Sequence, residues 1–435
     1  MKKKLQICFA VLVFICNSNA QVTVPASIKT SAAILQDFMD QRFGLFIHWG
    51  PITLRGTEIG WSRNHEVEQN DYDSLYKEFN PVLFNADEWV KTAKDAGVKY
   101  ITITAKHHDG FCLWPSAFTN YTISNTPFKK DVVGLLAKAC KKYGIKFCIY
   151  YTVLDWYQQD YPEHNGGKNT QEANMPNFLL YMKNQLKELI SHYHPYMLWF
   201  DGNWEKPWTQ EMAADVYTYI KKLDPQVIIN NRLGKTTHKI LTPETIGDYA
   251  TPEQEIGKIN MTDPWESCIT ICKQWAWKPN DEMKSLKECI FTLSKTAGGN
   301  GNLLFNVGPM PDGRFEKRQS NRLKEIGTWL SQNGSAIYGT KGGPYKPDSV
   351  FSSTRKGNKL FLHLYSNRGN DFKIPAIPGR KPVKAYFLNG GKMITCSQSG
   401  NNISLLWNTD MPDPVCNIIV IEMDDAIDLI PIIDA

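Results

Sequence analysis

Short apolar runs rich in β-branched and aromatic residues alternate with amphipathic stretches between about residues 40 and 335. This alternation is typical of parallel βα units. Helical periodicity is weak between residues 232 and 266, where we expect long loops. The pattern predicts an α/β fold, an irregular (β/α)8 (TIM-like) barrel. Its eight predicted strands are residues 45–49, 100–106, 146–152, 197–201, 226–231, 247–252, 265–271 and 302–307.

The pattern changes after Ile337-Tyr338-Gly339, where short alternating strands are broken by Gly, Pro and Asn. The clearest of these strands are residues 359–365, 384–388 and 417–422. Short strands with frequent turn residues are typical of a β-sandwich. We therefore expect a barrel that carries the chemistry over residues 21–339, followed by a C-terminal antiparallel β-sandwich over residues 340–435.

The first twenty residues have the three parts of a signal peptide. Lys2, Lys3 and Lys4 form the positive region, residues 7–15 are apolar, and Ser18-Asn19-Ala20 is a small-residue cleavage site. We expect residues 1–20 to be removed and the protein to be exported. The short Lys-rich start favours a bacterial periplasmic or secreted protein over a lysosomal one. No later run reaches the roughly 20 apolar residues of a membrane-spanning helix.

Charge excludes one class of partner, and aromatic content favours another. The chain has 49 Lys and Arg against 44 Asp and Glu, and these are interspersed. Nucleic-acid binding needs clustered basic residues, so no nucleic-acid partner is expected. The 13 Trp, 19 Tyr and 20 Phe offer flat apolar faces, several with a polar handle, and such faces suit sugar stacking.

Polar and aromatic residues follow the first five predicted strands, at the end where a barrel places its chemistry. Imidazole, phenol, carboxyl and guanidinium groups would converge there, which describes a pocket for several hydroxyl groups. The pocket is therefore predicted to bind a sugar. The strand-end residues are His48, His107, His108, Tyr150, Tyr151, Asp201 and Arg232.

A metal site is the main alternative for the histidines. His107 and His108 could hold an ion with Asp109 and His48, but neighbouring strand residues point to opposite faces. The close pair Cys268 and Cys272 lacks a second pair, and we expect the cysteines of the mature chain to be buried thiols. No Gly-rich dinucleotide fingerprint follows the first strand. Neither a metal nor a cofactor is expected.

Sugar hydrolysis needs two carboxyl groups. Asp201 is the candidate nucleophile, because it ends an apolar strand and precedes Gly202. Glu253, directly after Pro252, is preferred as the acid/base. Glu266 starts a strand, at the stabilising end of a barrel, and Glu255 is expected to be solvated. The choice among Glu253, Glu255 and Glu266 stays open.

Four motifs together resemble the α-L-fucosidases of glycoside hydrolase family 29. They are Phe43-Gly44-Leu45-Phe46-Ile47-His48-Trp49-Gly50, Lys106-His107-His108-Asp109-Gly110-Phe111, Trp199-Phe200-Asp201-Gly202 and Trp265-Glu266-Ser267-Cys268. The resemblance covers roughly residues 30 to 340. It implies a retaining hydrolase with a carboxylate nucleophile on an irregular barrel followed by a β-sandwich.

The resemblance also implies roles for individual residues. The nucleophile falls on Asp201 and the acid/base on Glu253. Many members carry adjacent Glu and Trp after the first strand, whereas this chain reads Glu58-Ile59-Gly60-Trp61, so both contacts are implied but not placed. Tyr151 is the alternative to Tyr150, because a one-residue slip exchanges the two faces. The implied substrate-binding residues are His48, Glu58, Trp61, His107, His108, Tyr150, Trp199, Arg232 and Trp275.

The expected activity is that of a retaining exo-glycosidase that removes terminal α-L-fucose from fucosylated oligosaccharides or glycoconjugates. Two alternatives stay open: a catalytically silent fucose-binding lectin, which would not require two carboxylates, and another barrel exo-glycosidase. Linkage preference, transglycosylation and oligomeric state are not predicted from the sequence.

Overall fold

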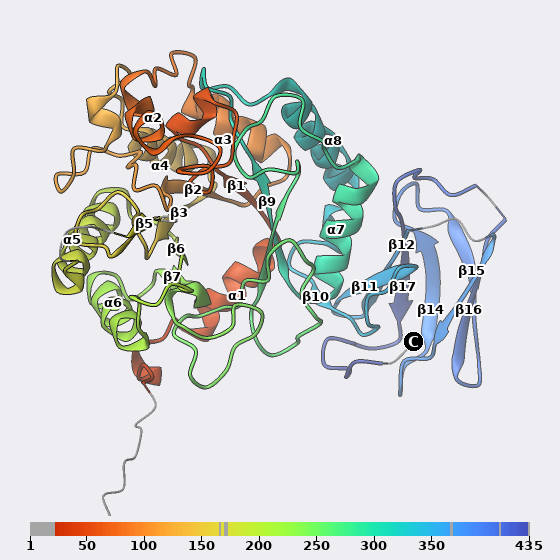
Figure 1. The fold of residues 1–435 in the computed structure, drawn as a ribbon. Coiled ribbons are helices and arrows are strands. Elements are labelled where there is room, and N and C mark those ends of the chain that lie inside the picture. Colours follow the sequence, from red (N-terminus) through yellow and green to blue (C-terminus); the bar gives the residue numbers. More distant parts are fainter. Residues whose placement is uncertain (1–21, 165–166, 169–172, 366–368, 409, 434–435) are drawn as a thin grey trace, which may run out of the picture.

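The computed structural model describes residues 22–164, 167–168, 173–365, 369–408 and 410–433. The predicted signal peptide, residues 1–20, lies outside the described residues. Figure 1 shows a sheet wrapped by helices and, beside it, a second sheet built from the C-terminal strands. Both sheets were expected from the sequence.

The first sheet has seven strands, all of them paired in parallel. Four of them have the bounds predicted from the sequence, and nearly all of their residues are buried. In spatial order the strands are β7 (Ile228–Ile229), β6 (Met197–Asp201), β3 (Lys146–Thr152), β2 (Tyr100–Lys106), β1 (Phe43–Ile47), β9 (Asn302–Val307) and β8 (Glu266–Thr270).

The predicted strand over residues 247–252 is not a regular strand. This segment lies between β7 and β8 and pairs with them only through isolated parallel bridges, Asn230 to Tyr249 and Ala250 to Trp265. Gly247 has a φ of 144°, and a Cβ there would lie 2.5 Å from the Asn230 carbonyl oxygen. Pro252 has no N–H that could donate a hydrogen bond to a neighbouring strand. The barrel is therefore closed by an irregular segment, and that segment leads into Glu253.

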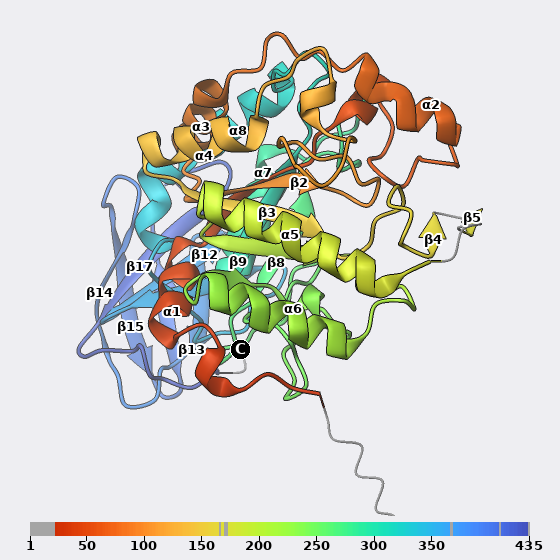
Figure 2. The same ribbon diagram turned by 90° about the vertical axis from the view of Figure 1, so that its left-hand side faces the viewer.

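Helices cover the outer face of the parallel sheet, and α5 and α6 lie side by side over part of it (Figure 2). Most of them start at a capping side chain that accepts a first-turn N–H, as Asp131 does for α4 and Ser285 for α7. The helices are α1 (Ala32–Gln41), α2 (Gln69–Ser74), α3 (Ala86–Asp95), α4 (Val132–Tyr143), α5 (Met175–Tyr193), α6 (Gln210–Leu223), α7 (Leu286–Gly298) and α8 (Lys317–Asn333).

Short elements fill several of the connections. A two-residue pair, β4 (Glu163–His164) and β5 (Gly167–Lys168), lies in the loop after β3. From residue 234 to residue 265 the chain forms no helix, in agreement with the weak periodicity there. The 3-10 turns are η1 (Ala26–Ile28), η2 (Pro51–Leu54), η3 (Leu75–Lys77), η4 (Ile123–Asn125), η5 (Asn231–Leu233) and η6 (Gly334–Ala336).

The inside of the barrel is filled by aromatic side chains below the strand ends. Phe38 of α1 packs against Tyr100 and Tyr249, with ring centroids 5.8 and 4.8 Å apart. The Asn302 side chain of β9 donates a hydrogen bond to the Phe38 carbonyl (2.8 Å). Helix α1 therefore closes the amino end of the barrel, and the space above the aromatic layer opens only toward the carboxyl ends of the strands.

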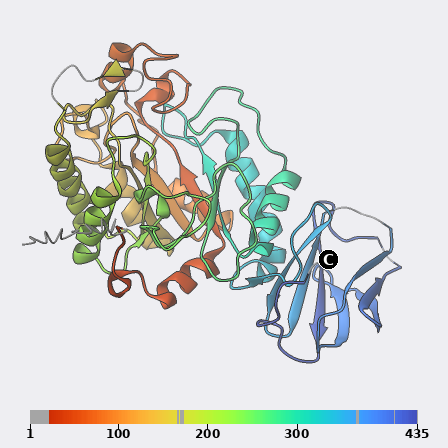
Figure 3. The same ribbon diagram turned by 60° about the horizontal axis from the view of Figure 1, so that its bottom comes forward.

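The C-terminal strands form an eight-stranded antiparallel sheet with its own apolar core, which Figure 3 shows to one side of the barrel. Helix α7 lies against it, where Ser352 donates a hydrogen bond to the Ser294 carbonyl (3.1 Å). In spatial order the strands are β10 (Lys341–Gly342), β11 (Phe351–Lys356), β12 (Lys359–Leu364), β17 (Asn417–Met423), β14 (Pro382–Phe387), β15 (Met393–Ser399), β16 (Asn402–Leu406) and β13 (Asp371–Pro375).

The cysteines of the described chain are free thiols, and all but Cys396 are buried. This confirms the expectation of buried thiols for most of them. Across the described residues no helix is long and apolar enough to cross a membrane.

Candidate active site

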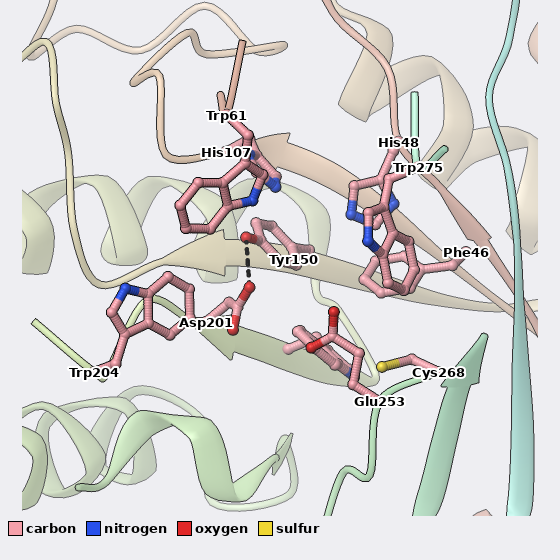
Figure 4. A pocket seen from close by; sticks show the side chains of 11 residues that line it. Phe46, His48, Trp61, His107, Tyr150, Asp201, Trp204, Glu253, Cys268 and Trp275 are labelled. Carbon is pink, nitrogen blue, oxygen red and sulfur yellow. Dashed lines mark hydrogen bonds between the residues drawn. The ribbon is translucent and has the colours of Figure 1, made fainter. Parts of the chain in front are cut away.

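A cavity of about 270 Å³ lies at the carboxyl ends of the parallel strands (Figure 4). Most of the residues expected at the site lie in its wall. Three further wall residues, Phe46, Trp204 and Cys268, were not among the predicted site residues. The wall is formed by Phe46, His48, Trp61, His107, Tyr150, Trp199, Asp201, Trp204, Glu253, Cys268 and Trp275.

Asp201 ends β6, and its carboxylate is fixed from several sides. Oδ1 accepts a hydrogen bond from Arg232 Nη1 (2.9 Å) and Oδ2 accepts one from the Tyr150 hydroxyl (3.2 Å), drawn in Figure 4. His108 Nε2 lies 3.6 Å from Oδ2. Gly202 follows with a φ of 90°, and a Cβ there would lie 2.7 Å from Leu154. The result is an oriented carboxylate at the cavity wall.

Glu253 places a second carboxylate beside Arg232, the cation that also pairs with Asp201. Its Oε2 lies 2.8 Å from Arg232 Nη1, and its side chain is 36% exposed. Because one nitrogen contacts both residues, Asp201 Oδ1 and Glu253 Oε2 are at most 5.7 Å apart, the sum of the 2.9 Å and 2.8 Å contacts. Two carboxylates therefore share one small cavity.

Arg232, which lies in η5, is held rigidly beneath these carboxylates. Its Nε and Nη2 donate to the hydroxyl and the carbonyl of Thr251 (both 3.0 Å), and its guanidinium lies 4.9 Å from the Trp199 ring. Burial favours the neutral form of Arg232, but the charges of Asp201 and Glu253 keep its pKa above the ordinary value. Arg232 therefore stays a cation and counterbalances the carboxylates.

The other candidate carboxylates lie elsewhere. Glu255 is exposed and pairs with Lys239 (2.8 Å). Glu266 is fully buried inside the barrel, where Trp199 Nε1 (3.1 Å) and the Tyr100 hydroxyl donate to it. Burial raises the pKa of Glu266 to about 7. Its place beneath Trp199 fits a supporting role, and of these three glutamates Glu253 is the one in the cavity wall.

Three buried histidines surround the cavity as neutral imidazoles. Burial lowers the pKa of His48 and of His108 to about 3, and lowers that of His107 well below its usual value. His48 Nδ1 is paired with Asn306 Oδ1 (2.6 Å) and His108 Nδ1 with the Thr152 hydroxyl (2.8 Å). Neutral rings offer directional hydrogen bonds to uncharged hydroxyl groups.

His107 and His108 both lie at the rim of the cavity, although the alternation of side chains along a strand predicted that they would point to opposite faces. Strand β2 ends at Lys106, so both residues lie in the turn beyond it, and their ring centroids are 4.2 Å apart. Asp109 turns away and accepts from the buried Tyr72 hydroxyl (2.7 Å). Among the residues that the structure describes, no group of His, Cys, Asp or Glu side chains is arranged to hold a metal ion.

Aromatic rings form the floor and one side of the cavity. Tyr150 stacks on Trp199, with centroids 5.5 Å apart at 18°. Tyr151 points to the outer face, where its hydroxyl donates to Gln185 (2.7 Å), so Tyr150 is the tyrosine that faces the cavity. Trp275 lies 4.8 Å from the His48 ring. The floor is therefore apolar and the rim carries hydrogen-bonding groups.

Trp61 and Trp204 lie at the mouth of the cavity. They are 45% and 47% exposed and stack on each other with centroids 5.9 Å apart. Trp204 and Asn306, the partner of His48, were not among the predicted site residues. Trp204 follows Asp201 by three residues in an irregular loop, and this closeness to the candidate nucleophile was the available signal. Asn306 lies at the carboxyl end of β9, so its position at a strand end was the available signal.

Three expected site residues are absent from the cavity wall: His108 and Arg232, which lie beside Asp201, and Glu58. Glu58 Oε2 accepts from the backbone N–H of Trp275 (2.8 Å), and its Oε1 accepts from those of Ala276 (2.9 Å) and Ile59 (3.1 Å). Burial raises the pKa of Glu58 to about 7, although these hydrogen bonds oppose the increase. The carboxylate connects the loop after β1 to the loop after β8.

Comparisons with known proteins agree with this geometry. The family model described as alpha-L-fucosidase matches residues 13–335. The tissue alpha-L-fucosidase of Bos taurus is 30% identical over 362 residues, which are 75% of this chain and 74% of the relative. The human tissue enzyme is 29% identical over 414 residues, 86% of this chain and 83% of the relative.

Solved structures give the same result. Alpha-L-fucosidase isoenzyme 1 from Paenibacillus thiaminolyticus has a TM-score of 0.83 and 31% identity, and covers 90% of this chain and 99% of its own. A GH29 alpha-L-fucosidase from Bacteroides thetaiotaomicron, solved as a trapped covalent intermediate, has a TM-score of 0.83 and 28% identity, with 92% and 98% coverage. Because the family model spans most of the chain, this protein belongs to the α-L-fucosidase family.

Proposed function

We propose that this protein is a retaining exo-glycosidase that hydrolyses terminal α-L-fucose from fucosylated oligosaccharides or glycoconjugates. The observation that carries the proposal is the pair of carboxylates on one Arg232 nitrogen, with oxygens at most 5.7 Å apart, the sum of 2.9 and 2.8 Å. Retaining glycosidases place their carboxyl groups about 5–5.5 Å apart, whereas inverting enzymes leave room for a water molecule. The family and its named relatives support fucose as the sugar.

The proposed mechanism is a double displacement. Asp201 attacks the anomeric carbon while Glu253 donates a proton to the leaving glycosidic oxygen, so that the carbon–oxygen bond breaks and a fucosyl ester forms on Asp201. Glu253 then takes a proton from water, which attacks the same carbon and releases Asp201. The Bacteroides relative, solved as a trapped covalent intermediate with a Glu-to-Gln mutant, supports a route through a covalent intermediate. No step requires a metal or a cofactor.

The cavity wall, together with His108 and Arg232 beside Asp201, supplies the proposed sugar contacts. His48, His107 and His108 bind fucose hydroxyls, and Tyr150 and Arg232 orient the nucleophile beside the anomeric carbon. Trp275 lies against the methyl group of the sugar. Trp199 forms the floor and Trp61 borders the mouth.

A panel of p-nitrophenyl glycosides tests the proposal. We expect turnover of the α-L-fucoside and negligible turnover of the α- and β-galactosides, since the expected site is shaped for a 6-deoxy sugar. Proton NMR of the reaction should show α-L-fucose as the first product, before it equilibrates with the β-anomer. A first product in the β-configuration would contradict retention, and turnover of a galactoside alone would contradict the sugar.

We also propose that the protein is exported and begins at Gln21 in its mature form, because residues 1–20 have the charge and apolar pattern of a signal peptide. Expression of the full chain in a Gram-negative host should give a periplasmic protein whose intact mass lacks residues 1–20. Recovery of the full-length mass from the cytoplasm would contradict this proposal.

A further inference from the structure

We infer that Glu58 is a positioning residue that holds Trp275 in the cavity wall, and that it is not a direct ligand of the sugar. The inference deepens the proposed function, on which its kinetic test rests. It assigns this chain's Glu58-Ile59-Gly60-Trp61 segment a different use from the adjacent Glu-Trp pair of many relatives.

Both oxygens of Glu58 are already used by backbone N–H groups. Oε2 accepts from Trp275 (2.8 Å), and Oε1 accepts from Ala276 (2.9 Å) and from Ile59 (3.1 Å). Two consecutive N–H groups of one loop therefore each have their own oxygen of one carboxylate, and a carboxamide lacks the second acceptor oxygen. Glu58 itself does not line the cavity.

The loop that carries Trp275 depends on such contacts. It follows β8 and contains no helix or strand up to α7, so side chains must satisfy its N–H groups. Asp281 accepts from the N–H groups of Lys273 and Gln274 (both 2.9 Å), and Glu58 takes the next two. Glu58 is therefore the acceptor that ties this loop to the other side of the cavity.

The opposite end of the Trp275 peptide is also fixed. Asn306 Nδ2 donates to the Trp275 carbonyl (2.7 Å), while Asn306 Oδ1 pairs with His48 (2.6 Å). The Trp275 ring lies 4.8 Å from the His48 ring and 6.0 Å from that of Phe46. With its N–H bound to Glu58 and its carbonyl bound to Asn306, the backbone of Trp275 is fixed on both sides while its ring packs against His48 and Phe46.

Glutamine at position 58 would have nearly the same shape as glutamate but would not accept both backbone hydrogen bonds in the same way. Its amide has one acceptor oxygen, and its NH2 group would face a backbone N–H. Glu58→Gln is therefore the informative variant. Glu68 provides a matched control, since its exposed carboxylate also accepts two consecutive backbone N–H groups, those of Asn70 and Asp71 (2.9 and 3.1 Å). Glu68 lies outside the cavity wall.

The first test observes Trp275 directly and does not need activity. The protein is labelled with 5-fluorotryptophan, and the Trp275 fluorine resonance is identified by its loss in Trp275→Phe. We expect Glu58→Gln to shift or broaden this resonance and Glu68→Gln to leave it unchanged. If Glu58→Gln does not fold, Glu58→Asp, which withdraws the oxygens by one methylene, gives the same readout. An unchanged Trp275 resonance in a folded variant would overturn the inference.

The second test uses a substrate without the methyl group. The β-D-arabinopyranoside has the ring of the α-L-fucoside but lacks this methyl, so it has nothing to place against Trp275. Because one apolar group in a pocket changes kcat/KM by about 10–200-fold, we expect Glu58→Gln to lower kcat/KM about 10-fold for the fucoside and less than about 2-fold for the arabinoside. In a Trp275→Ala background, Glu58→Gln should have almost no further effect.

Equal losses on both substrates, with the full loss retained in the Trp275→Ala background, would show that Glu58 contacts a ring hydroxyl and would overturn the inference. Absence of wild-type turnover on the fucoside would count against the proposed function instead, and the fluorine resonance would then decide the role of Glu58.

Discussion

Asp201→Gly is expected to lower kcat for p-nitrophenyl α-L-fucoside by roughly 10⁴-fold or more, since loss of the nucleophile removes the covalent route. The glycine leaves a space beside Arg232 Nη1 and the Tyr150 hydroxyl, the two groups that contact Asp201 in the intact protein. Azide fits this space as a small anion. Added azide should therefore restore part of the turnover and give β-L-fucosyl azide, because one displacement inverts the anomeric carbon.

The matched control is Asp312→Gly. Asp312 is also paired with an arginine, Arg314 (2.6 Å), but it lies outside the cavity wall, so kcat should change less than about 2-fold. Circular dichroism and thermal unfolding should show that both variants are folded. Full turnover in a folded Asp201→Gly variant, or azide products of the α-configuration, would assign the nucleophile to another residue.

Glu253→Ala is expected to separate substrates by their leaving groups. For a natural fucosyl linkage, which needs a proton on the leaving oxygen, kcat/KM should fall about 10²–10⁴-fold. For 2,4-dinitrophenyl fucoside, which needs no such proton, the first step should be nearly unchanged. The basic limb of the pH profile, which reports loss of the proton from the general acid, should disappear. Steady-state kinetics on the two substrates between pH 4 and 9 measure both effects.

Glu255→Ala is the control for this variant. Glu255 lies two residues further along, is exposed and pairs with Lys239 (2.8 Å), so its loss should change kcat/KM less than about 2-fold. Azide added to Glu253→Ala should give fucosyl azide of retained configuration, because it attacks the ester on Asp201. A Glu253→Ala variant that keeps its basic limb and its activity on natural linkages would exclude Glu253 as the acid/base.

Much of the barrel could be predicted because most residues of its strands are buried. Strands β2, β3, β6 and β9 match the predicted bounds, since each is an unbroken run bounded by turn or charged residues. The prediction of a strand over residues 247–252 was wrong. The apolar residues of this segment do not reveal that Gly247 packs against backbone atoms and that Pro252 has no N–H to donate. A periodic pattern of hydrophobic residues indicates which residues are buried, but it does not indicate which backbone groups form the hydrogen bonds of a sheet.

The site was predictable where a strand end fixes a residue and was not predictable where a loop does. Asp201 and Tyr150 follow directly from their strands. Glu58 meets Trp275 across 217 residues of chain, and nothing local in the sequence encodes that contact. Asn306 lies at a strand end, but its contact with the Trp275 carbonyl likewise depends on a loop from another part of the chain. Loop-borne contacts depend on the assembled barrel and therefore needed the structure.

The closure of the barrel by α1 has a kinetic consequence. Phe38, Tyr100 and Tyr249 fill the interior beneath the cavity, so the cavity is a blind pocket whose mouth is bordered by the stacked rings of Trp61 and Trp204. A sugar at its base can leave only through the passage that the rest of the substrate occupies. The aglycone must therefore depart before fucose does, and water must enter by the same passage. Free fucose should then act as a competitive inhibitor, and the aglycone alone should bind weakly.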